Sequence, residues 1–322
     1  ISIVTPSYQQ AAYLETAIRS VLNQDYPALE YFVMDGASSD GSVEIIQKYE
    51  NQLSGWISEK DGGQADAINK GFSCCSGDIF GWINSDDFYL RKSFSAVADF
   101  FASHPDVDLV YGDVLSLDGS NKLLNVMHYK DYDLTDLMTF RIIGQPAVFF
   151  RRRAWEEAGG LDLNYHYLLD HHLWLRIASR GKIAYQHNLW AVARFYAEAK
   201  NRAHAAEFGK EAFRLAEWMK TDALLKKTYQ QKQRRILGGA NWLDANYLSN
   251  GDMAWKALSR YWDAFCLFPG RVLEDHRRLA LTLLMTAAPQ KAATLYEKKT
   301  AKRLEQMKTC QAILDEELKH LS

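Results

Sequence analysis

Two adjacent carboxylates, Asp86 and Asp87, are the first residues along the chain whose type and spacing could support chemistry. They follow a short apolar run, Ile79–Ile83, and a run of this length between polar residues favours a buried strand over a helix. The carboxyl end of a strand is where ligands bind in open α/β sheets. Because adjacent carboxylates repel each other unless they are compensated, and because oxygen ligands suit Mg²⁺ or Mn²⁺, we expect a metal-bridged diphosphate here.

A purely structural explanation of the same segment stays open. Asn84, Ser85 and Asp86 are residue types that form turns and cap helices, and a helix is predicted to begin near Arg91. The spacing of the residues does not separate this alternative from the metal site.

Asp170 is the second candidate, because it lies in the first turn of a predicted apolar helix. Leu169, Leu173 and Ile177 share one face of that helix. The helix dipole favours an anion in the first turn, so Asp170 is either a structural cap or a reactive group. A metal site made by the adjacent pair His171 and His172 is disfavoured, because neighbouring side chains on a helix diverge.

A repeated strand–loop–helix pattern must position these carboxylates. Strands are predicted at residues 1–4, 30–34, 56–58 and 77–83, with helices between them, which indicates an α/β fold with a mostly parallel sheet flanked by helices. No GxGxxG or GxxxxGK[ST] motif occurs, which argues against a dinucleotide enzyme or a P-loop NTPase. The four strands end in polar loops that should meet at one sheet edge and that carry Thr5 and Ser7, Asp35 and Ser38, Asp61 and Gln64, and Asp86 and Asp87.

The remainder of the chain changes character after about residue 204. Strands are predicted at 109–117, 122–127 and 144–150, and from residue 205 the composition is typical of helices. We therefore expect an α/β domain at residues 1–204 and an all-helical region at residues 205–322. The helices are predicted at 205–235, 241–264, 273–287 and 291–321, with breaks at 248–252 and 268–270, and the last helix is amphipathic.

Composition limits the partners and the compartment. A formal net charge of −2 gives no electrostatic support for nucleic-acid binding. Four cysteines match neither a zinc-site spacing nor a disulfide framework, which favours a reducing cytoplasm. No apolar run reaches the roughly 18 residues of a membrane span. The chain opens at Ile1, inside a predicted strand and without an initiator Met, so a targeting segment upstream would not be visible in this sequence.

Four segments occur in the order TPSYQQAAYLETAIRSVLNQDYP, DGASSDGS, EKDGGQADAINKGF and INSDD. In sequence and in order they resemble the motifs of family 2 glycosyltransferases with the GT-A fold. The resemblance covers about residues 1–204. It implies an inverting enzyme that takes a sugar from a nucleotide diphosphate sugar, most often a UDP-sugar, with a divalent cation, Mn²⁺ or Mg²⁺, on the diphosphate.

The resemblance also implies which residues contact the donor. In the family, the first loop and the Asp of the second loop contact the base, which assigns that contact to Thr5, Tyr8 and Asp35. The INSDD segment corresponds to the Asp-x-Asp metal motif, with Asn84 at its first acidic position and Asp86 at the ligand position. The donor contacts that we expect are Thr5, Pro6, Tyr8, Asp35, Ser38, Asp61, Gln64, Asp66, Asn69 and Asp86.

Catalytic and further metal-binding residues follow from the same resemblance. Asp170 matches the catalytic base, an Asp before an apolar helix, although the usual preceding Glu is Leu169 here. Many relatives place a metal-binding His within residues 191–202, and Glu198 occupies that position in this chain. The expected metal ligands are therefore Asp86, Asp87 and Glu198.

Together these implications describe one reaction. Asp170 would take the proton of an acceptor hydroxyl, and a single displacement would invert the anomeric centre while the cation offsets charge on the departing diphosphate. We expect a glycan or lipid-linked glycan as acceptor, in bacterial-type surface polysaccharide or glycoconjugate synthesis. The enzyme would work in the cytoplasm at the inner face of the membrane, with peripheral membrane contact and a homo-oligomer formed through the C-terminal helices.

Two other functions stay open. A sugar nucleotidylyltransferase also has a parallel sheet and an acidic metal site, but it needs a Gly-rich basic loop after the first strand, and residues 5–10 contain neither Gly nor a cation. A catalytically silent nucleotide-sugar-binding or scaffolding module would leave the biological work to the helical region. Release of nucleoside diphosphate from a UDP-sugar without acceptor would favour an enzyme over that module.

Overall fold

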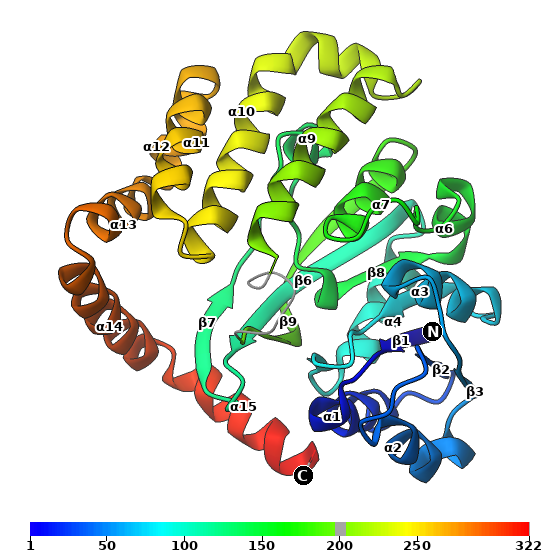
Figure 1. The fold of residues 1–322 in the computed structure, drawn as a ribbon. Helices are drawn as coiled ribbons and strands as arrows, with labels where there is room; N and C mark the ends of the chain where they lie inside the picture. Colours follow the sequence, from blue (N-terminus) through cyan, green and yellow to red (C-terminus); the bar gives the residue numbers. More distant parts are fainter. Residues whose placement is uncertain (197–203, 322) are drawn as a thin grey trace. The chain divides into compact units, whose positions relative to one another are not determined.

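The computed structural model describes residues 1–196 and 204–321, which form two compact units (Figure 1). Unit 1 consists of Ile1–Asp131, Ile143–Arg194 and Met307–Ser322, and unit 2 of Tyr132–Ile142 and Phe195–Gln306. The packing therefore groups one short internal segment with the helical region, and it groups the C-terminal segment with the α/β region.

Unit 1 is built on a nine-stranded sheet in the order β3-β2-β1-β4-β8-β6-β9-β5, with β7 paired to β6. The neighbours β3, β2, β1 and β4 are parallel, and so are β6 and β9, whereas β8 runs antiparallel between β4 and β6. The predicted α/β class is confirmed, and the sheet itself is mixed, with four parallel and four antiparallel strand pairings among the described residues. The strands are β1 (Ser2–Ser7), β2 (Glu30–Asp35), β3 (Gly55–Ser58), β4 (Ile79–Trp82), β5 (Phe88–Tyr89), β6 (Val107–Leu117), β7 (Leu123–Met127), β8 (Val148–Arg151) and β9 (Lys182–Arg194).

Helices cover both faces of this sheet, as two neighbouring residues of β8 show. Successive side chains of a strand point to opposite faces. Phe150 contacts Phe72 of α3, Trp155 of α6 and Trp174 of α7, whereas Phe149 contacts Phe94 of α4. The helices of unit 1 are α1 (Ala11–Leu22), α2 (Ser42–Tyr49), α3 (Gln64–Ser73), α4 (Ser93–Ser103), α6 (Arg152–Ala158), α7 (Leu169–Ala178) and α15 (Lys308–Leu321), with 3₁₀ turns at η1 (Glu50–Gln52) and η2 (Gln145–Ala147).

One local prediction in unit 1 was wrong in part. The strand predicted at 144–150 is the 3₁₀ turn η2 followed by the four-residue strand β8. The helix predicted to start near Arg91 is confirmed as α4, which begins at Ser93 after the two-residue strand β5. Lys92 has φ 64°, a left-handed conformation that interrupts any helix before Ser93.

Among its described residues, unit 2 contains helices and no strand, as predicted. The breaks predicted at 248–252 and 268–270 are confirmed, because α10 ends at Asn250 and α11 ends at Leu267. Other helix ends differ from the prediction. The break expected after residue 235 is absent, because α10 continues through Gly238 and Gly239. A Cβ atom at Gly239 would lie 2.1 Å from the carbonyl oxygen of Thr139, so glycine allows close helix packing at this point. The helices are α5 (Leu134–Met138), α9 (Ala205–Thr221), α10 (Lys226–Asn250), α11 (Ala254–Leu267), α12 (Pro269–Glu274), α13 (His276–Ala287) and α14 (Pro289–Gln306).

The true break in this stretch lies between α9 and α10. The Asp222 carboxylate accepts hydrogen bonds from the backbone N–H groups of Leu224 and Leu225, which is a turn typical of Asp. Over residues 1–196 and 204–321, none of the helices is long and apolar enough to cross a membrane.

Candidate active site

The predicted site residues of the first loops lie where the parallel strands β1, β2, β3 and β4 end. These strands share one direction, so the loops that follow them lie at the same edge of the sheet. Gly36, just after β2, marks where three of these loops meet. A Cβ atom there would lie 3.0 Å from Asp61 Oδ2 and 3.2 Å from the ring of Tyr8. The two side chains therefore approach the same point on the backbone, from the loops after β3 and β1.

Asp35 organises the loop after β2. It is 2% exposed, and its carboxylate accepts hydrogen bonds from the Ser38 backbone N–H at 2.8 Å, from the Ser38 hydroxyl at 2.6 Å and from the Ser58 hydroxyl at 2.7 Å. The Ser38 hydroxyl also accepts a hydrogen bond from the Gln9 backbone N–H, which ties the first loop to the second. Asp35 and Ser38 thus fix the relative position of these loops.

The solvent exposure of the first-loop residues differs among Thr5, Pro6 and Tyr8. Thr5 and Pro6 are buried within β1, and Thr5 Oγ1 lies 2.9 Å from the Tyr31 hydroxyl of β2. Tyr8 is 63% exposed, which leaves its ring available for stacking. Of the three residues expected from the first loop, Tyr8 presents the largest contact surface.

The third loop and α3 carry four predicted donor contacts that have different surroundings. Asp61 accepts a hydrogen bond from the Gly63 backbone N–H at 2.8 Å. Asp66 accepts one from the Gly62 backbone N–H, which lowers the pKa of its carboxyl, and it also pairs with Lys70 at 3.2 Å. These contacts shape the turn that starts α3.

Asn69 and Gln64 reach out from α3 to other parts of unit 1. The Asn69 side chain donates to the Leu161 carbonyl and accepts from the Leu161 backbone N–H, both at 2.9 Å, so it holds the segment that precedes α7. Gln64 Nε2 donates to Asn84 Oδ1 at 2.7 Å. Gln64 therefore joins the third loop to the acidic motif.

Asn84 stands at the centre of a hydrogen-bond network rather than at the position of a ligand carboxylate. Besides accepting from Gln64, its Nδ2 donates to Asp87 Oδ2 at 3.4 Å and to Gln145 Oε1 at 3.3 Å. Gln145 donates in turn to the carbonyl oxygen of Trp82, the last residue of β4. An amide at position 84 can both accept and donate, which a carboxylate at this position could not do.

The two carboxylates of the motif have different environments. Asp87 is 6% exposed, and its Oδ1 accepts a hydrogen bond from the Arg194 backbone N–H at 2.9 Å. Burial raises the pKa of the Asp87 carboxyl well above its usual range, and the charge of Asp86 adds to this effect. Asp86 is only half-buried. Both carboxylate oxygens of Asp87 already accept hydrogen bonds. Asp86 is therefore better placed than Asp87 to bind a ligand.

The residues present fit a divalent cation in part. A half-buried carboxylate beside a hydrogen-bonded one suits Mg²⁺ or Mn²⁺, which bind through one or two carboxylates and complete their shell with water or phosphate oxygens. Asp86 would hold the ion, and Asp87 would add negative charge beside it. The third expected ligand, Glu198, lies outside the described residues.

Arg194, at the end of β9, is a site residue that the sequence did not reveal. It is 4% exposed, its Nη1 donates to the Asp86 carbonyl oxygen, and its guanidinium stacks 4.9 Å from the Tyr13 ring and 5.0 Å from the Phe88 ring. The guanidinium charge opposes the rise in the pKa of Asp87. The one signal in the sequence is a cation directly after the buried run Ala191–Ala193.

Asp170 lies in the first turn of α7, which begins at Leu169. Trp174, one turn later, stacks on Trp82, the last residue of β4, with ring centroids 5.2 Å apart. α7 ends at Ala178, just before β9 begins at Lys182, and β9 has the direction of β4, because β9 is parallel to β6 and β8 is antiparallel to both β6 and β4. The end of α7 that carries Asp170 is therefore directed towards the sheet edge at which β4 ends, where Asp86 also lies. Asp170 is half-buried, and its Oδ1 accepts a hydrogen bond from the His171 backbone N–H at 2.7 Å.

Comparison with known proteins gives matches in sequence and in fold. Residues 2–158 match the family model described as Glycosyl transferase family 2. A PGL/p-HBAD biosynthesis glycosyltransferase of Mycobacterium bovis is 30% identical over 173 residues, which are 52% of this chain and 66% of that protein. The chain therefore spans slightly less than two thirds of the length of this curated relative.

Two solved structures share the fold. TarS 1–349 of S. aureus in complex with UDP-GlcNAc has a TM-score of 0.58 at 15% identity, covering 81% of this chain and 86% of that one. The mannosyltransferase PcManGT of Pyrobaculum calidifontis in complex with GDP-Man and Mn²⁺ has a TM-score of 0.54 at 19% identity, covering 98% of this chain and 85% of that one. The likeness confirms the GT-A fold that the sequence motifs imply.

Proposed function

Because the chain belongs to glycosyl transferase family 2 and has the GT-A fold, we propose that it transfers a sugar from a nucleotide diphosphate sugar to an acceptor hydroxyl with inversion. The donor that we propose is a UDP-sugar, and the acceptor is a glycan or lipid-linked glycan in surface polysaccharide or glycoconjugate synthesis. The observation that supports this most is the placement of Asp170 and Asp86 towards the same sheet edge, at which β4 ends.

Asp170 would act as the general base. It accepts the proton of the acceptor hydroxyl while the acceptor oxygen forms a bond to the anomeric carbon and the bond from that carbon to the diphosphate breaks. One displacement on the face opposite the leaving group inverts the anomeric centre. The half-buried carboxylate of Asp170 supports this role, because it meets both the interior and solvent.

The donor would be held along the edge formed by the loops after β1 to β4. Tyr8, Asp35 and Asp61 lie together around Gly36 and would bind the nucleoside, with Asp86 at the diphosphate. A divalent cation bound by Asp86 would offset negative charge on the diphosphate. The PcManGT complex contains Mn²⁺ together with GDP-Man, which supports manganese as this cation.

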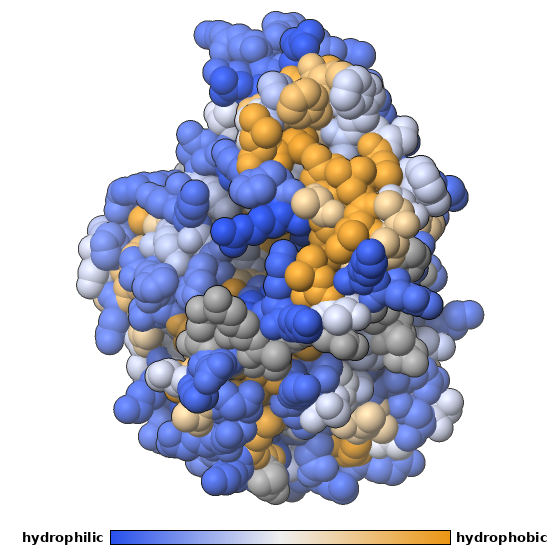
Figure 2. Space-filling model, turned by 90° about the vertical axis from the view of Figure 1, so that its left-hand side faces the viewer, coloured by the Kyte–Doolittle hydropathy of each residue, from blue (hydrophilic) through white to orange (hydrophobic). Residues whose placement is uncertain are grey.

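Peripheral membrane contact is proposed for unit 2. Its helices α11–α14 carry exposed large hydrophobic side chains, and Figure 2 shows a broad hydrophobic patch on this side of the molecule. Trp255 and Trp262 are 74% and 66% exposed and lie seven residues apart, which places them on one face of α11. Tryptophan is the residue type that anchors proteins at the membrane interface.

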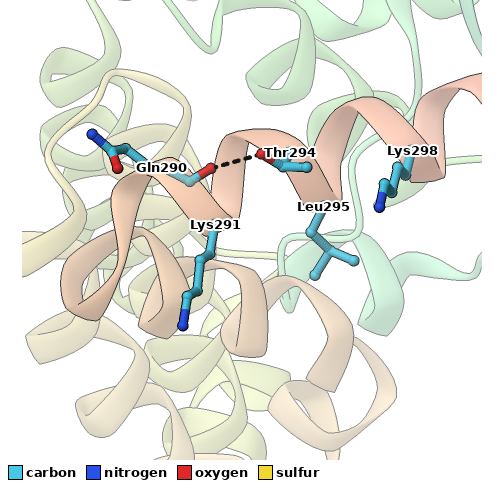
Figure 3. Close-up of a pocket in the computed structure, with 5 residues that line it drawn as sticks. All are labelled: Gln290, Lys291, Thr294, Leu295 and Lys298. Carbon is cyan, nitrogen blue, oxygen red and sulfur yellow. Dashed lines mark hydrogen bonds between the residues drawn. The ribbon is translucent and has the colours of Figure 1, made fainter.

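A basic surface on α14 supports the same proposal. The hollow in Figure 3 is lined by Gln290, Lys291, Thr294, Leu295 and Lys298, and in that view Lys291, Leu295 and Lys298 point to the same side of the helix. Lysines beside exposed apolar side chains suit anionic lipid head groups. We propose a cytoplasmic location at the inner face of the membrane, and assembly of copies through the C-terminal helices.

The decisive experiment is the substitution Asp170→Asn. Asparagine keeps much of the ability to cap a helix but cannot accept a proton, so we expect a folded protein whose transfer to acceptor falls by about 10²-fold or more. Metal-dependent UDP affinity should stay unchanged. Asp99→Asn, which alters an exposed carboxylate on α4, serves as the control and should keep full transfer.

Transfer by Asp170→Asn within a few-fold of the unsubstituted enzyme would show that the base lies elsewhere. UDP binding without release of UDP from any UDP-sugar would instead favour a catalytically silent binding module. A screen of nucleotide sugars by thermal shift, with and without Mn²⁺, identifies the donor before the transfer assay is run.

A further inference from the structure

Three potential metal ligands lie together in unit 1, on a part of the sheet that the proposed reaction does not use. Asp113 belongs to β6, His128 follows β7 directly, and His187 belongs to β9. The Nδ1 atoms of His128 and His187 lie 2.7 Å and 3.2 Å from the same oxygen of Asp113, Oδ2. One potential ligand atom from each residue can be chosen so that all lie within 4.8 Å of one another.

Strand pairing brings these residues together although they are distant in sequence. β6 pairs antiparallel with β7, so that Val114 lies opposite Met127 and His128 follows at the level of Asp113. β6 pairs parallel with β9, so that Asp113 lies opposite Leu189. The site is therefore a product of the sheet and not of a local sequence motif.

An irregularity of β9 turns His187 towards Asp113. The register runs from Tyr111 opposite Tyr185 to Asp113 opposite Leu189, so β9 uses two more residues than β6 over this step. A bulge of this kind re-aims side chains and is common beside functional sites. Gly112 permits the close approach, because a Cβ atom there would lie 2.7 Å from the carbonyl oxygen of Asn188.

Asp113 is a buried carboxylate whose hydrogen-bond donors, among the residues that the structure describes, carry no permanent positive charge. It is 1% exposed, and besides its hydrogen bond with His128 Nδ1 it accepts hydrogen bonds from the Tyr185 hydroxyl at 2.7 Å and from the Tyr129 backbone N–H at 3.2 Å. The same Tyr185 hydroxyl lies 2.8 Å from His187 Nδ1 and is hydrogen-bonded to it. A buried charge is costly unless it is paired or binds a metal. The side chains of His128 and His187 are 57% and 75% exposed, so an ion has access from solvent.

We propose that Asp113, His128 and His187 bind a Zn²⁺ ion. Two imidazole nitrogens and one carboxylate oxygen form a donor set that zinc prefers, with a fourth position left for water or another ligand. The hydrogen bond from Tyr185 to the second oxygen of Asp113 would orient that ligand, as outer-shell partners of metal sites do. Mn²⁺ and Mg²⁺ favour oxygen ligands, so this site differs in metal preference from the acidic motif at Asp86.

The test measures metal binding by the metal-stripped full chain in two ways. Isothermal titration calorimetry measures the binding of Zn²⁺, and visible absorption measures the binding of Co²⁺ as a substitute ion. We expect saturable binding of one ion. His128→Ala and His187→Ala each remove one of three ligands and should weaken Zn²⁺ binding by at least about tenfold, since even loss of an outer-shell partner typically costs about 10- to 100-fold. Both histidines are exposed, so these variants should fold.

Matched controls separate this site from others. His276→Ala removes an exposed histidine of unit 2 and should leave Zn²⁺ affinity unchanged. Asp86→Ala should also leave Zn²⁺ affinity at the histidine site unchanged, so failure of the proposed transferase activity does not affect this test. Tyr185→Phe, which keeps the ring and loses the hydroxyl, should weaken Zn²⁺ binding.

Zn²⁺ affinity that stays the same in the double variant His128→Ala/His187→Ala would overturn the proposal. A lack of saturable Zn²⁺ binding by the unsubstituted chain would overturn it as well. A thermal shift with Zn²⁺ that disappears in the double variant would support it, because an ion that binds only the folded state stabilises that state.

Discussion

The neighbouring carboxylates Asp86 and Asp87 have different roles in the acidic motif. Asp87 is enclosed, with Asn84 on one oxygen and the Arg194 backbone N–H on the other, and burial raises the pKa of its carboxyl. Asp86 is half-buried and lies beside it. One residue therefore holds the motif in the fold, and the other would meet the metal and the diphosphate.

This division predicts different effects of two substitutions. Asp86→Ala should weaken UDP binding in Mn²⁺ and change little in EDTA, because a metal ligand matters only when the metal is present. Asp87→Ala should instead lower the free energy of unfolding, because it removes the acceptor of the Arg194 backbone N–H. UDP affinities by calorimetry, with and without Mn²⁺, check the first effect. Equal UDP affinity of the unsubstituted protein in Mn²⁺ and EDTA would refute the metal's role.

Arg194 should matter more for stability than a surface arginine does. Arg194→Met removes the donor of hydrogen bonds to the Asp86 carbonyl oxygen and to Asn121 Oδ1, and leaving buried polar groups unsatisfied typically costs about 1–3 kcal/mol. Urea unfolding at pH 7 measures this loss. Arg180→Met, at an exposed position, is the control and should cost less than about 1 kcal/mol. A similar effect of both substitutions would contradict this role of the Arg194 hydrogen bonds.

The sequence identified the acidic motif but not the residues that hold it. Asn84 to Asp87 are contiguous and follow an apolar strand, so the sequence alone predicted both the polar cluster and its position at the end of that strand. Arg194 lies more than a hundred positions further on and meets the motif only because β9 pairs with β5. Contacts set by strand pairing between distant segments leave no local pattern for a single sequence to show.

At the scale of elements, Glu30 joins the beginnings of three strands. Its carboxylate accepts hydrogen bonds from the Ser2 hydroxyl of β1 and from Ser76 and Gly77, just before β4. Burial alone would raise the pKa of this carboxyl, but the hydrogen bonds lower it to about 2. Glu30 itself begins β2, so one ionised side chain sets the spacing of β1, β2 and β4.

This lowered pKa predicts a pH dependence of stability. A carboxyl whose folded-state pKa is depressed stabilises the fold above its unfolded-state pKa, and that contribution is lost as pH falls from about 4.5 towards about 2. Glu30→Gln should therefore lower the free energy of unfolding by about 1–2 kcal/mol at pH 7, and the difference should shrink below about pH 4.5.

Urea unfolding of both proteins between pH 7 and pH 3 measures this difference. Glu50→Gln, at an exposed position of η1, is the matched control and should follow the unsubstituted protein at every pH. A difference between Glu30→Gln and the unsubstituted protein that stays constant down to pH 3 would contradict the role of the Glu30 charge.

The sequence predicted some strands and helices more accurately than others. The strands and helices of the first eighty residues follow clear hydrophobic periods, so the prediction was close. In unit 2, the prediction ended one helix at Arg235 and began the next at Asn241, and Gly238 and Gly239 lie in the interval between them. The glycines instead allow α10 to pack closely on Thr139 and Phe268, a requirement that arises only from the tertiary structure.

At the scale of the whole molecule, the exposed aromatic side chains of α11 predict lipid binding. Trp255→Ser combined with Trp262→Ser should reduce flotation with vesicles of anionic and zwitterionic lipid, because both rings are more than half exposed. Donor hydrolysis should be unchanged. Leu224→Ser removes another exposed hydrophobic side chain, between α9 and α10, and is the control. Equal flotation of the double variant and the control would exclude this surface as the lipid contact.

The sequence predicted a helical region after residue 204 but did not predict how its last helix packs. The amphipathic pattern of α15 indicates that one face is buried, without indicating against what. In the structure, α15 belongs to unit 1, where Leu314 and Leu321 are buried and Glu317 pairs with Arg91 at 2.8 Å. An ion pair between residues so distant in sequence has no signature in local periodicity.

The return of α15 to unit 1 sets an order of events during translation. The ribosome completes the sheet long before it makes residues 308–321, because all of 195–306 comes between them. At about 5–20 residues per second, the nascent unit 1 waits on the order of ten seconds for its last helix. During that interval the surface that will receive Leu314 and Leu321 is uncovered, which makes it a site where a chaperone can act on the unfinished chain.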